Sequence, residues 1–323
     1  MNLQIKILVC LGALLAVAAT TNALKRYEYS RAKVTALVVD EAGKPVVGAK
    51  VSCSFCEAYD ANKVVRSEGL TDSEGKFVAE GFCGGVYGAS LKMDGFYFSG
   101  LNAPRFSGIV DGKWQPWNST AETILRRIGN PVALYAKSAW LSIPVIGEPC
   151  GYDLEKGDWV APYGKGIVSD FILKLERRYV SRDDFDVSVE LSFSKPLDGI
   201  KQIQWPESGR CSIFKWPRNA DEAGYEAILK SSLVSAGNNY KASITRKEGY
   251  FFRVRTVEQN GKIVSAHYGK IKGGLELAPS NSKTCRVKLT YYFNPTPLDR
   301  NLEWDTTKNL LGGLSWEESP RDP

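Results

Sequence analysis

Histidine is almost absent from this chain: His267 is the only one among 323 residues. Catalytic zinc sites usually combine two or three histidine or glutamate ligands, and serine and cysteine hydrolases need a histidine base. A single histidine within a predicted strand is more consistent with a hydrogen-bonded structural residue than with a ligand. We therefore expect no metal ion, no cofactor and no catalytic triad.

A strong charge of one sign is also lacking. The chain has 42 basic and 36 acidic residues, a formal net charge of +6, and its lysines and arginines are scattered without a run. Nucleic-acid binding generally needs a dense band of cations on one surface. The sequence therefore gives no support for nucleic acid or an anionic membrane as a partner.

Long hydrophobic runs are missing beyond the N-terminus. The apolar residues 7–19 are too few to cross a bilayer as a helix, but they suit the hydrophobic region of a signal peptide. Small residues up to Ala23 predict removal of residues 1–23, with cleavage after Ala18 as the alternative. This removal takes away one lysine and no acid, which leaves a net charge of +5. We expect an exported protein, periplasmic or extracellular, with no transmembrane segment after signal removal.

The most informative stretch of the chain spans residues 38–97. Apolar residues alternate over 34–38 and over 47–51, on either side of the turn-forming cluster Asp40-Glu41-Ala42-Gly43-Lys44-Pro45. Further turn signals occupy 71–75 and 93–95. Alternation with a period of two, bounded by Asp, Gly and Pro, indicates short half-buried strands. Several such strands predict a β-sandwich.

Four motifs in this stretch carry a family resemblance. They are D-x-x-G-x-P-V-x-G-A-x-V at 40–51, T-D-x-x-G-x-F at 71–77, G-x-Y at 85–87 and x-G-F at 94–96. Together they resemble the carboxypeptidase regulatory-like domain, a transthyretin-type β-sandwich, over residues 32–98. Domains of that family are accessory modules without catalytic residues of their own. The resemblance therefore implies a non-catalytic first domain.

The length of the chain favours two domains. We expect a carboxypeptidase regulatory-like β-sandwich at 24–100, with a mobile polar loop at 57–69. A linker or inter-domain segment is expected at 101–128, whose last eight residues fit either helical turns or a strand. A β-rich domain of unknown function should occupy 129–323. The predicted fold class is mainly β: a signal peptide, a transthyretin/Ig-like β-sandwich and a larger β-rich domain with one or two short helices.

The second domain shows several strand patterns. Alternating residues predict strands at 170–175 and 185–191, and a last strand at 285–293. Asn260-Gly261 is a favoured two-residue hairpin turn between two such patterns. A helix is expected to begin near Asn219, and the tail after Asn294 is expected to drape over the domain or fray.

Other segments of the second domain resemble recurring segments of uncharacterised exported bacterial proteins. They lie at 130–137, 151–163, 265–271 and 294–305. This resemblance implies no activity.

Six cysteines remain after signal removal, and we interpret them as structural disulfide candidates: Cys53, Cys56, Cys83, Cys150, Cys211 and Cys285. An even count in an exported protein suggests disulfides, with buried free thiols as the alternative. Three of the six lie in the first domain, so complete pairing needs at least one bridge between domains. Cys53 and Cys56 face opposite sides of a strand, which would let one of them meet Cys83.

Four acids of the second domain lie close in sequence to two aromatic residues: Asp153, Glu155, Asp158 and Asp170 stand near Trp159 and Tyr163. Paired carboxylates with aromatics are what a glycosidase requires. The sequence fixes no separation between these carboxyl groups, so we favour solvated surface positions over a catalytic pair.

Trp114 and Trp117 stand three residues apart in a turn-rich segment. Such residues can stack on sugar rings, or they can bury a seam between domains, which we favour because Trp is usually buried. Our candidate binding residues are Trp114, Trp117, Trp159 and Tyr163. We assign no catalytic residue and no metal ligand.

These observations favour an exported non-catalytic binding or structural (scaffolding) protein. Its expected partner is a cell-surface or extracellular polysaccharide, or another cell-envelope protein. The alternative is a carbohydrate-active hydrolase that uses a carboxylate pair in the second domain.

Overall fold

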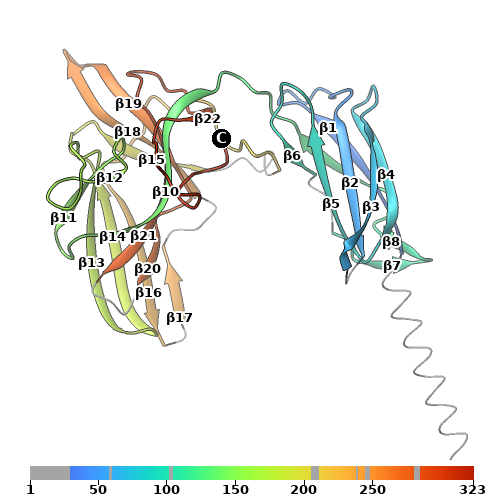
Figure 1. The fold of residues 1–323 in the computed structure, drawn as a ribbon, viewed down its shortest axis with the longest axis horizontal. Helices are drawn as coiled ribbons and strands as arrows, with labels where there is room; N and C mark the ends of the chain where they lie inside the picture. The colour runs from blue at the N-terminus through green and yellow to red at the C-terminus, as the bar shows by residue number, and fades with distance from the viewer. Residues whose placement is uncertain are drawn as a thin grey trace, which may run out of the picture. The chain divides into compact units, whose positions relative to one another are not determined.

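The structure is a computed structural model that describes residues 30–57, 60–101, 105–204, 211–237, 239–243, 248–279 and 284–323. The chain divides into two compact units. Unit 1 comprises residues 1–128 and 207–214, and unit 2 comprises 129–206 and 215–323. Both units are built from strands, as predicted (Figure 1). The predicted signal peptide lies outside the described residues, and within the described part no helix is long and apolar enough to span a membrane.

Unit 1 is formed by two sheets, whose strand orders are β4-β1-β8-β7, with β9 also pairing with β1, and β3-β2-β5-β6 (Figure 1). The strands are β1 (Ser30–Val39), β2 (Lys50–Glu57), β3 (Asp60–Leu70), β4 (Lys76–Cys83), β5 (Val86–Lys92), β6 (Ser99–Gly100), β7 (Gly108–Val110), β8 (Lys113–Gln115) and β9 (Ser119–Ile124). Alternating residues of both sheets, among them Val38, Phe55 and Leu91, meet in one buried core.

The turns of unit 1 follow directly from its motifs. The Asp40 carboxylate accepts hydrogen bonds from the backbone N–H groups of Ala42 (2.9 Å) and Lys44 (3.0 Å). Asp72 accepts in the same way from Glu74 and Lys76, at 2.9 Å each. Such bonds from an aspartate to the backbone ahead of it close a tight turn. The D-x-x-G and T-D-x-x-G patterns therefore place the strands that follow them.

The two segments expected to be a loop and a linker contain strands of unit 1. The expected mobile loop at 57–69 is wrong, because β3 pairs with β2 along its length. The expected linker at 101–128 supplies β7, β8 and β9, and β9 pairs in parallel with β1 from Val34↔Ser119 to Val39↔Ile124. Of the two alternatives expected for 121–128, helical turns or a strand, the strand is correct for 121–124. The chain also returns to unit 1 from far along the sequence, where the Gly100 N–H donates to the Cys211 carbonyl at 2.8 Å.

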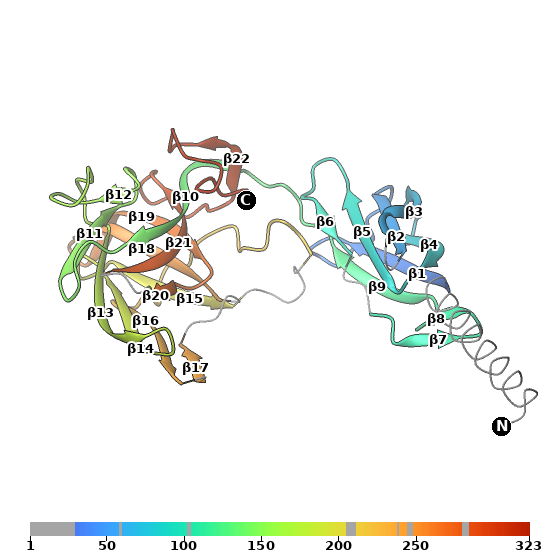
Figure 2. The same ribbon diagram turned by 60° about the horizontal axis from the view of Figure 1, so that its bottom comes forward.

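Unit 2 contains a seven-stranded sheet, β15-β18-β19-β21-β10-β22 with β20 also pairing with β21, and a six-stranded sheet, β12-β11-β13-β14-β16-β17 (Figure 2). Its strands are β10 (Val132–Ser142), β11 (Pro149–Asp153), β12 (Asp158–Trp159), β13 (Phe171–Ser181), β14 (Asp184–Ser192), β15 (Gly199–Gln204), β16 (Leu229–Ala236), β17 (Asn239–Ala242), β18 (Glu248–Gln259), β19 (Lys262–Lys272), β20 (Glu276–Pro279), β21 (Cys285–Asn294) and β22 (Trp304–Asn309).

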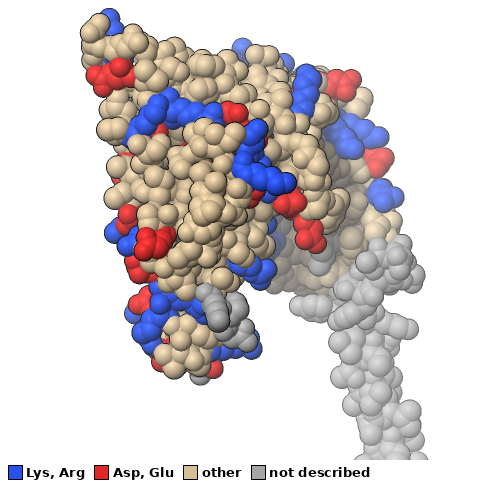
Figure 3. All heavy atoms as spheres, turned by 60° about the vertical axis from the view of Figure 1, so that its left-hand side comes forward, with Lys and Arg blue, Asp and Glu red and all other residues tan. Residues whose placement is uncertain are grey.

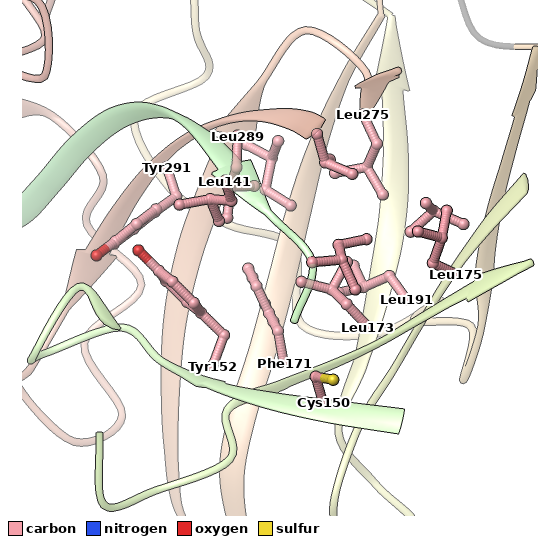
Figure 4. Close-up of a cluster of buried hydrophobic side chains, with 14 of the residues drawn as sticks. Leu141, Cys150, Tyr152, Phe171, Leu173, Leu175, Leu191, Leu275, Leu289 and Tyr291 are labelled. Carbon is pink, nitrogen blue, oxygen red and sulfur yellow. The ribbon is translucent and has the colours of Figure 1, made fainter. Parts of the chain in front are cut away.

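The core of unit 2 lies between these two sheets. Figure 4 shows Leu173 and Phe171 of the six-stranded sheet near Leu289 and Tyr291 of the seven-stranded sheet. The Phe171 ring also meets Phe252 edge to face, with centroids 4.9 Å apart. Burying one such large apolar side chain contributes about 1.5–3 kcal/mol. The inner face of the seven-stranded sheet is therefore occupied by the core, and its outer face remains for other contacts.

The predicted hairpin is confirmed, whereas the predicted helix is wrong. Asn260 and Gly261 have φ values of 52° and 74°, the left-handed geometry that a two-residue turn between β18 and β19 requires. Asn219 pairs with Asn301 through an isolated bridge, and Gly224 has a φ of 86°. Both features oppose helical geometry, and no helix is present in any described part of the chain.

Candidate binding site

The two tryptophans singled out in the first half of the chain do not form a binding platform. Trp114 is only 5% exposed, its indole N–H donates to the Cys83 carbonyl at 2.9 Å, and its ring stacks on Phe106 at 5.6 Å. It therefore belongs to the core of unit 1, and the preferred interpretation of a domain seam is wrong for this residue. Trp117 is half-buried, with the Lys113 ammonium 5.2 Å from its ring.

The other two predicted binding residues lie in unit 2. Trp159 is 8% exposed and packs edge to face on Tyr152, at 5.3 Å between centroids. Tyr163 is 45% exposed. Trp159 is thus a core residue, and Tyr163 is the only exposed side chain among the four.

Two of the four candidate catalytic carboxylates hold neighbouring loops in place by accepting backbone hydrogen bonds. Asp153 accepts hydrogen bonds from four backbone N–H groups, those of Glu155, Lys156, Ile167 and Val168, at 2.9–3.0 Å. Burial raises the pKa of this carboxyl, but the four bonds outweigh burial and hold the pKa below its ordinary value. Asp158 accepts from the N–H groups of Trp159 (2.8 Å) and Lys165 (2.9 Å).

The other two carboxylates hold the half-buried Arg255. Asp153 and Asp170 are each only 2% exposed, so the expected solvated surface position is wrong for both. Asp170 binds Arg255 through two bonds of 2.7 and 2.9 Å, and Glu155 contacts the same guanidinium. Burial would lower the pKa of Arg255, but its bonds to these acids raise it above its ordinary value. Burial also raises the pKa of the Asp170 carboxyl above its ordinary value, although the bonds to Arg255 act to lower it. This cluster ties loops of unit 2 together, which opposes an acid–base role for its members.

The predicted disulfides are contradicted by the structure. No disulfide joins any of the six cysteines that the structure describes, Cys53, Cys56, Cys83, Cys150, Cys211 and Cys285. Cys53 and Cys83 share the core of unit 1, and burial raises the pKa of Cys53 to about 11. The four buried cysteines, Cys53, Cys83, Cys150 and Cys285, pack as small apolar side chains.

A cavity of about 470 Å³ opens on unit 2 where the C-terminal segment meets strands of the seven-stranded sheet. We call it the Trp316 pocket. Its lining includes Ser138 of β10, Lys272 of β19, Glu276 of β20 and three residues of β21, Lys288, Thr290 and Tyr292. The C-terminal segment contributes Trp316, Glu317, Ser319, Pro320, Arg321 and Asp322.

Alternation along the strands explains which side chains reach this pocket. Leu289 and Tyr291 point into the core, so the intervening residues Lys288, Thr290 and Tyr292 belong to the opposite face of β21. Ser138 lies opposite Thr290 in the register, and their hydroxyls are 2.8 Å apart. The floor of the pocket is thus polar and fixed by sheet geometry.

The C-terminal segment is fastened to the sheet by backbone and charged groups. The Ser138 N–H donates to the Glu318 carbonyl at 2.8 Å, and the Tyr292 hydroxyl donates to the Asp322 carbonyl at 3.0 Å. Lys272 forms an ion pair with the Asp322 carboxylate. The tail therefore drapes over the domain, the first of the two outcomes expected for it, and forms one wall of the pocket.

Trp316 is unusually exposed for a tryptophan. The Trp316 side chain is 74% exposed, and the Arg321 guanidinium lies 3.6 Å from its ring centroid. Three of the residues that line the pocket are basic and three are acidic. On the face of the molecule in Figure 3, basic and acidic side chains are likewise interspersed. The pocket thus combines an indole surface with donors and acceptors of both charges.

This pocket could not be predicted from the sequence. Its lining comes from positions separated by more than a hundred residues, such as Ser138 and Lys272, which only the sheet brings together. One local signal was available. Trp316 stands in the polar, glycine-containing tail GGLSWEESPRDP, where no alternation predicts its burial.

No family model and no curated protein sequence matches this chain. Among solved structures, one match is a protein from Bacteroides uniformis ATCC 8492 that is described provisionally as carbohydrate binding. It is 11% identical, and the alignment covers 83% of this chain and 98% of that chain with a TM-score of 0.18. A TM-score this low shows no common fold, so neither fold nor ligand is carried over from that protein.

Proposed function

We propose that this is an exported, non-catalytic binding protein whose second unit holds a carbohydrate in the Trp316 pocket. The observation that carries the proposal is the 74% exposed indole of Trp316 at a polar cavity of about 470 Å³. Tryptophan is usually highly buried, so an exposed indole beside a cavity points to a ligand that covers it.

The chemistry of the pocket suits a sugar. A sugar ring presents an apolar C–H face that can stack on a large flat aromatic side chain. Its hydroxyl groups both donate and accept hydrogen bonds, and the floor offers the Ser138 and Thr290 hydroxyls beside the charged groups of Lys288 and Glu276. A site that only binds a sugar in this way needs no catalytic side chain.

The carboxylates of unit 2 favour binding over hydrolysis. Asp153, Asp158 and Asp170 accept hydrogen bonds from backbone N–H groups, and Asp170 also binds Arg255. A glycosidase needs one carboxyl group that can deliver a proton and a second one that faces the sugar. Carboxylates that hold loops in place are poorly suited to either role.

Unit 1 fits an accessory module. We propose that it belongs with the carboxypeptidase regulatory-like sandwiches, on the motifs whose aspartates Asp40 and Asp72 close its turns. Such a module would act as a scaffold for the binding unit outside the cytoplasm. Export is proposed from the apolar residues 7–19.

The test uses the mature chain, residues 24–323, on an array of polysaccharides, followed by calorimetry on each polymer bound. Trp316→Ala should weaken binding about tenfold or more, since a tryptophan that a ligand covers commonly supplies a large share of the affinity. Tyr163→Ala is the matched control, because it also removes an exposed aromatic of unit 2 but lies outside the pocket. Equal affinities for the two variants and the parent chain would refute the proposed site.

A further inference from the structure

A second exposed tryptophan, Trp140, lies on the same sheet face as the pocket floor. Trp140 is 42% exposed and stands two residues after Ser138 on β10. Residues two apart on a strand share a face and are about 7 Å apart along it. In the register with β21, Trp140 lies opposite Lys288 just as Ser138 lies opposite Thr290.

Lys288 joins Trp140 to the pocket. It lines the Trp316 pocket, and its ammonium lies 5.8 Å from the Trp140 ring centroid. The two indoles are therefore parts of one continuous surface along β10 and β21. A surface with an aromatic group on each side of a polar floor suits an extended chain better than a single sugar unit.

The Trp140 side of this surface is rich in cations. Arg286, two residues before Lys288 on the same face of β21, has its guanidinium 5.7 Å from the Trp140 ring centroid. The nearest acid in the register is Glu276, opposite Lys288 on β20. Cations beside an aromatic platform can bind the acidic group of a ring that stacks on that platform.

We infer that the ligand is an acidic polysaccharide of the uronate type, which runs from the Trp316 pocket onto Trp140 and places a carboxylate between Arg286 and Lys288. This inference rests on the proposed carbohydrate function and specifies its ligand. Arginine and lysine supply charge-assisted hydrogen bonds to a carboxylate, whereas a neutral sugar gains only stacking and weaker hydrogen bonds from its hydroxyl groups.

The experiment measures the affinity of the mature chain for matched polymers that differ in charge. Polygalacturonate and its fully methyl-esterified form share one backbone, and dextran sulfate with dextran tests a sulfate ester instead of a carboxylate. Polygalacturonate should bind more tightly than its ester. Its affinity should fall as salt rises, because ions screen exposed charges.

Variants then test the residues named. Lys288→Met and Arg286→Met should each weaken polygalacturonate binding roughly 3- to 10-fold, Trp140→Ala should weaken both galacturonate polymers, and Lys288→Arg should retain binding. Glu276→Gln should strengthen binding of the acid. Thermal unfolding of every variant shows whether the fold is kept.

The outcomes separate this inference from the proposed function. Equal binding of acid and ester, unaffected by Lys288→Met but lost in Trp316→Ala, overturns the acidic ligand and leaves the carbohydrate site standing. Binding of dextran sulfate alone overturns the uronate assignment. If none of the four polymers binds, the acidic ligand is overturned, and the polysaccharide array decides the proposed function by itself.

Discussion

The hydroxyl of Tyr292 in β21 donates a 3.0 Å hydrogen bond to the backbone carbonyl of Asp322, one residue before the last of the sequence. Tyr292 is almost fully buried and lines the Trp316 pocket, so this bond ties the C-terminal wall of the pocket to its floor. The position of Trp316 therefore depends on a contact made six residues further along the chain.

Tyr292→Phe removes this bond and little else. We expect a loss of about 1 kcal/mol from the attachment of the C-terminal segment, which should raise hydrogen exchange in residues 311–323 and weaken glycan binding. Hydrogen exchange followed by mass spectrometry measures the first effect. Unchanged exchange in the tail would show that other contacts, such as the Lys272–Asp322 ion pair, hold it without Tyr292.

Two glycines of unit 1 allow a matched test of its turns. Gly43 and Gly75 both have left-handed backbones, with φ of 74° and 73°, but only at Gly75 would an added Cβ meet the chain, 2.5 Å from the Val38 carbonyl oxygen. Gly43→Ala should cost about 1 kcal/mol, the usual penalty for that geometry. Gly75→Ala should cost about 1–2 kcal/mol more, measured by urea unfolding. Equal costs would mean that the Gly75 turn relaxes.

The pH dependence of unit 2 should follow Asp153. Its pKa is lowered in the folded protein by four backbone N–H bonds, so the unfolded chain takes up the proton first. The stability that Asp153 contributes is therefore present above its unfolded value of 3.8 and is lost as the pH falls through the lower folded value. Asp153→Asn should lower the free energy of unfolding at pH 7 and flatten its decline in acid. An unchanged acid slope in this variant would assign that decline to other groups.

Thiol reactivity gives a direct check on the absence of disulfides. Because Cys53 is buried and its pKa is raised to about 11, it should not react with a thiol reagent in the native protein at pH 8. Denaturation should release six reactive thiols in the mature chain. Fewer than six would mean that disulfides form after all.

The sequence could predict turns whose contacts lie within a few residues along the chain. Asp40 and Asp72 each close a turn through atoms within four residues, and Asn260-Gly261 closes its hairpin in the same way. Strand β3 escaped prediction because it is the last strand of its sheet and leaves Val65 and Leu70 exposed. An edge strand can be polar on its open side, so its alternation is weak.

Features that depend on distant pairings could not be predicted. The sequence left helical turns and a strand equally open at 121–128, because the strand β9 forms through pairing with β1, some eighty residues earlier. Trp140 lies on the outer face of the sheet because the pairing of β10 with β21 places it opposite Lys288. Cysteine parity suggested disulfides, but bridge formation depends on the placement of each thiol, which a count does not give.

The central claim is that a carbohydrate covers Trp316, and the indole N–H resonances of the mature chain test it most directly. Titration with a polysaccharide bound on the array should shift the resonance of Trp316, and that of Trp140 if the chain extends over it. The resonance of Trp114, which is buried in unit 1 and bonded to Cys83, should stay in place. Saturable binding that leaves the Trp316 resonance unmoved would contradict the account.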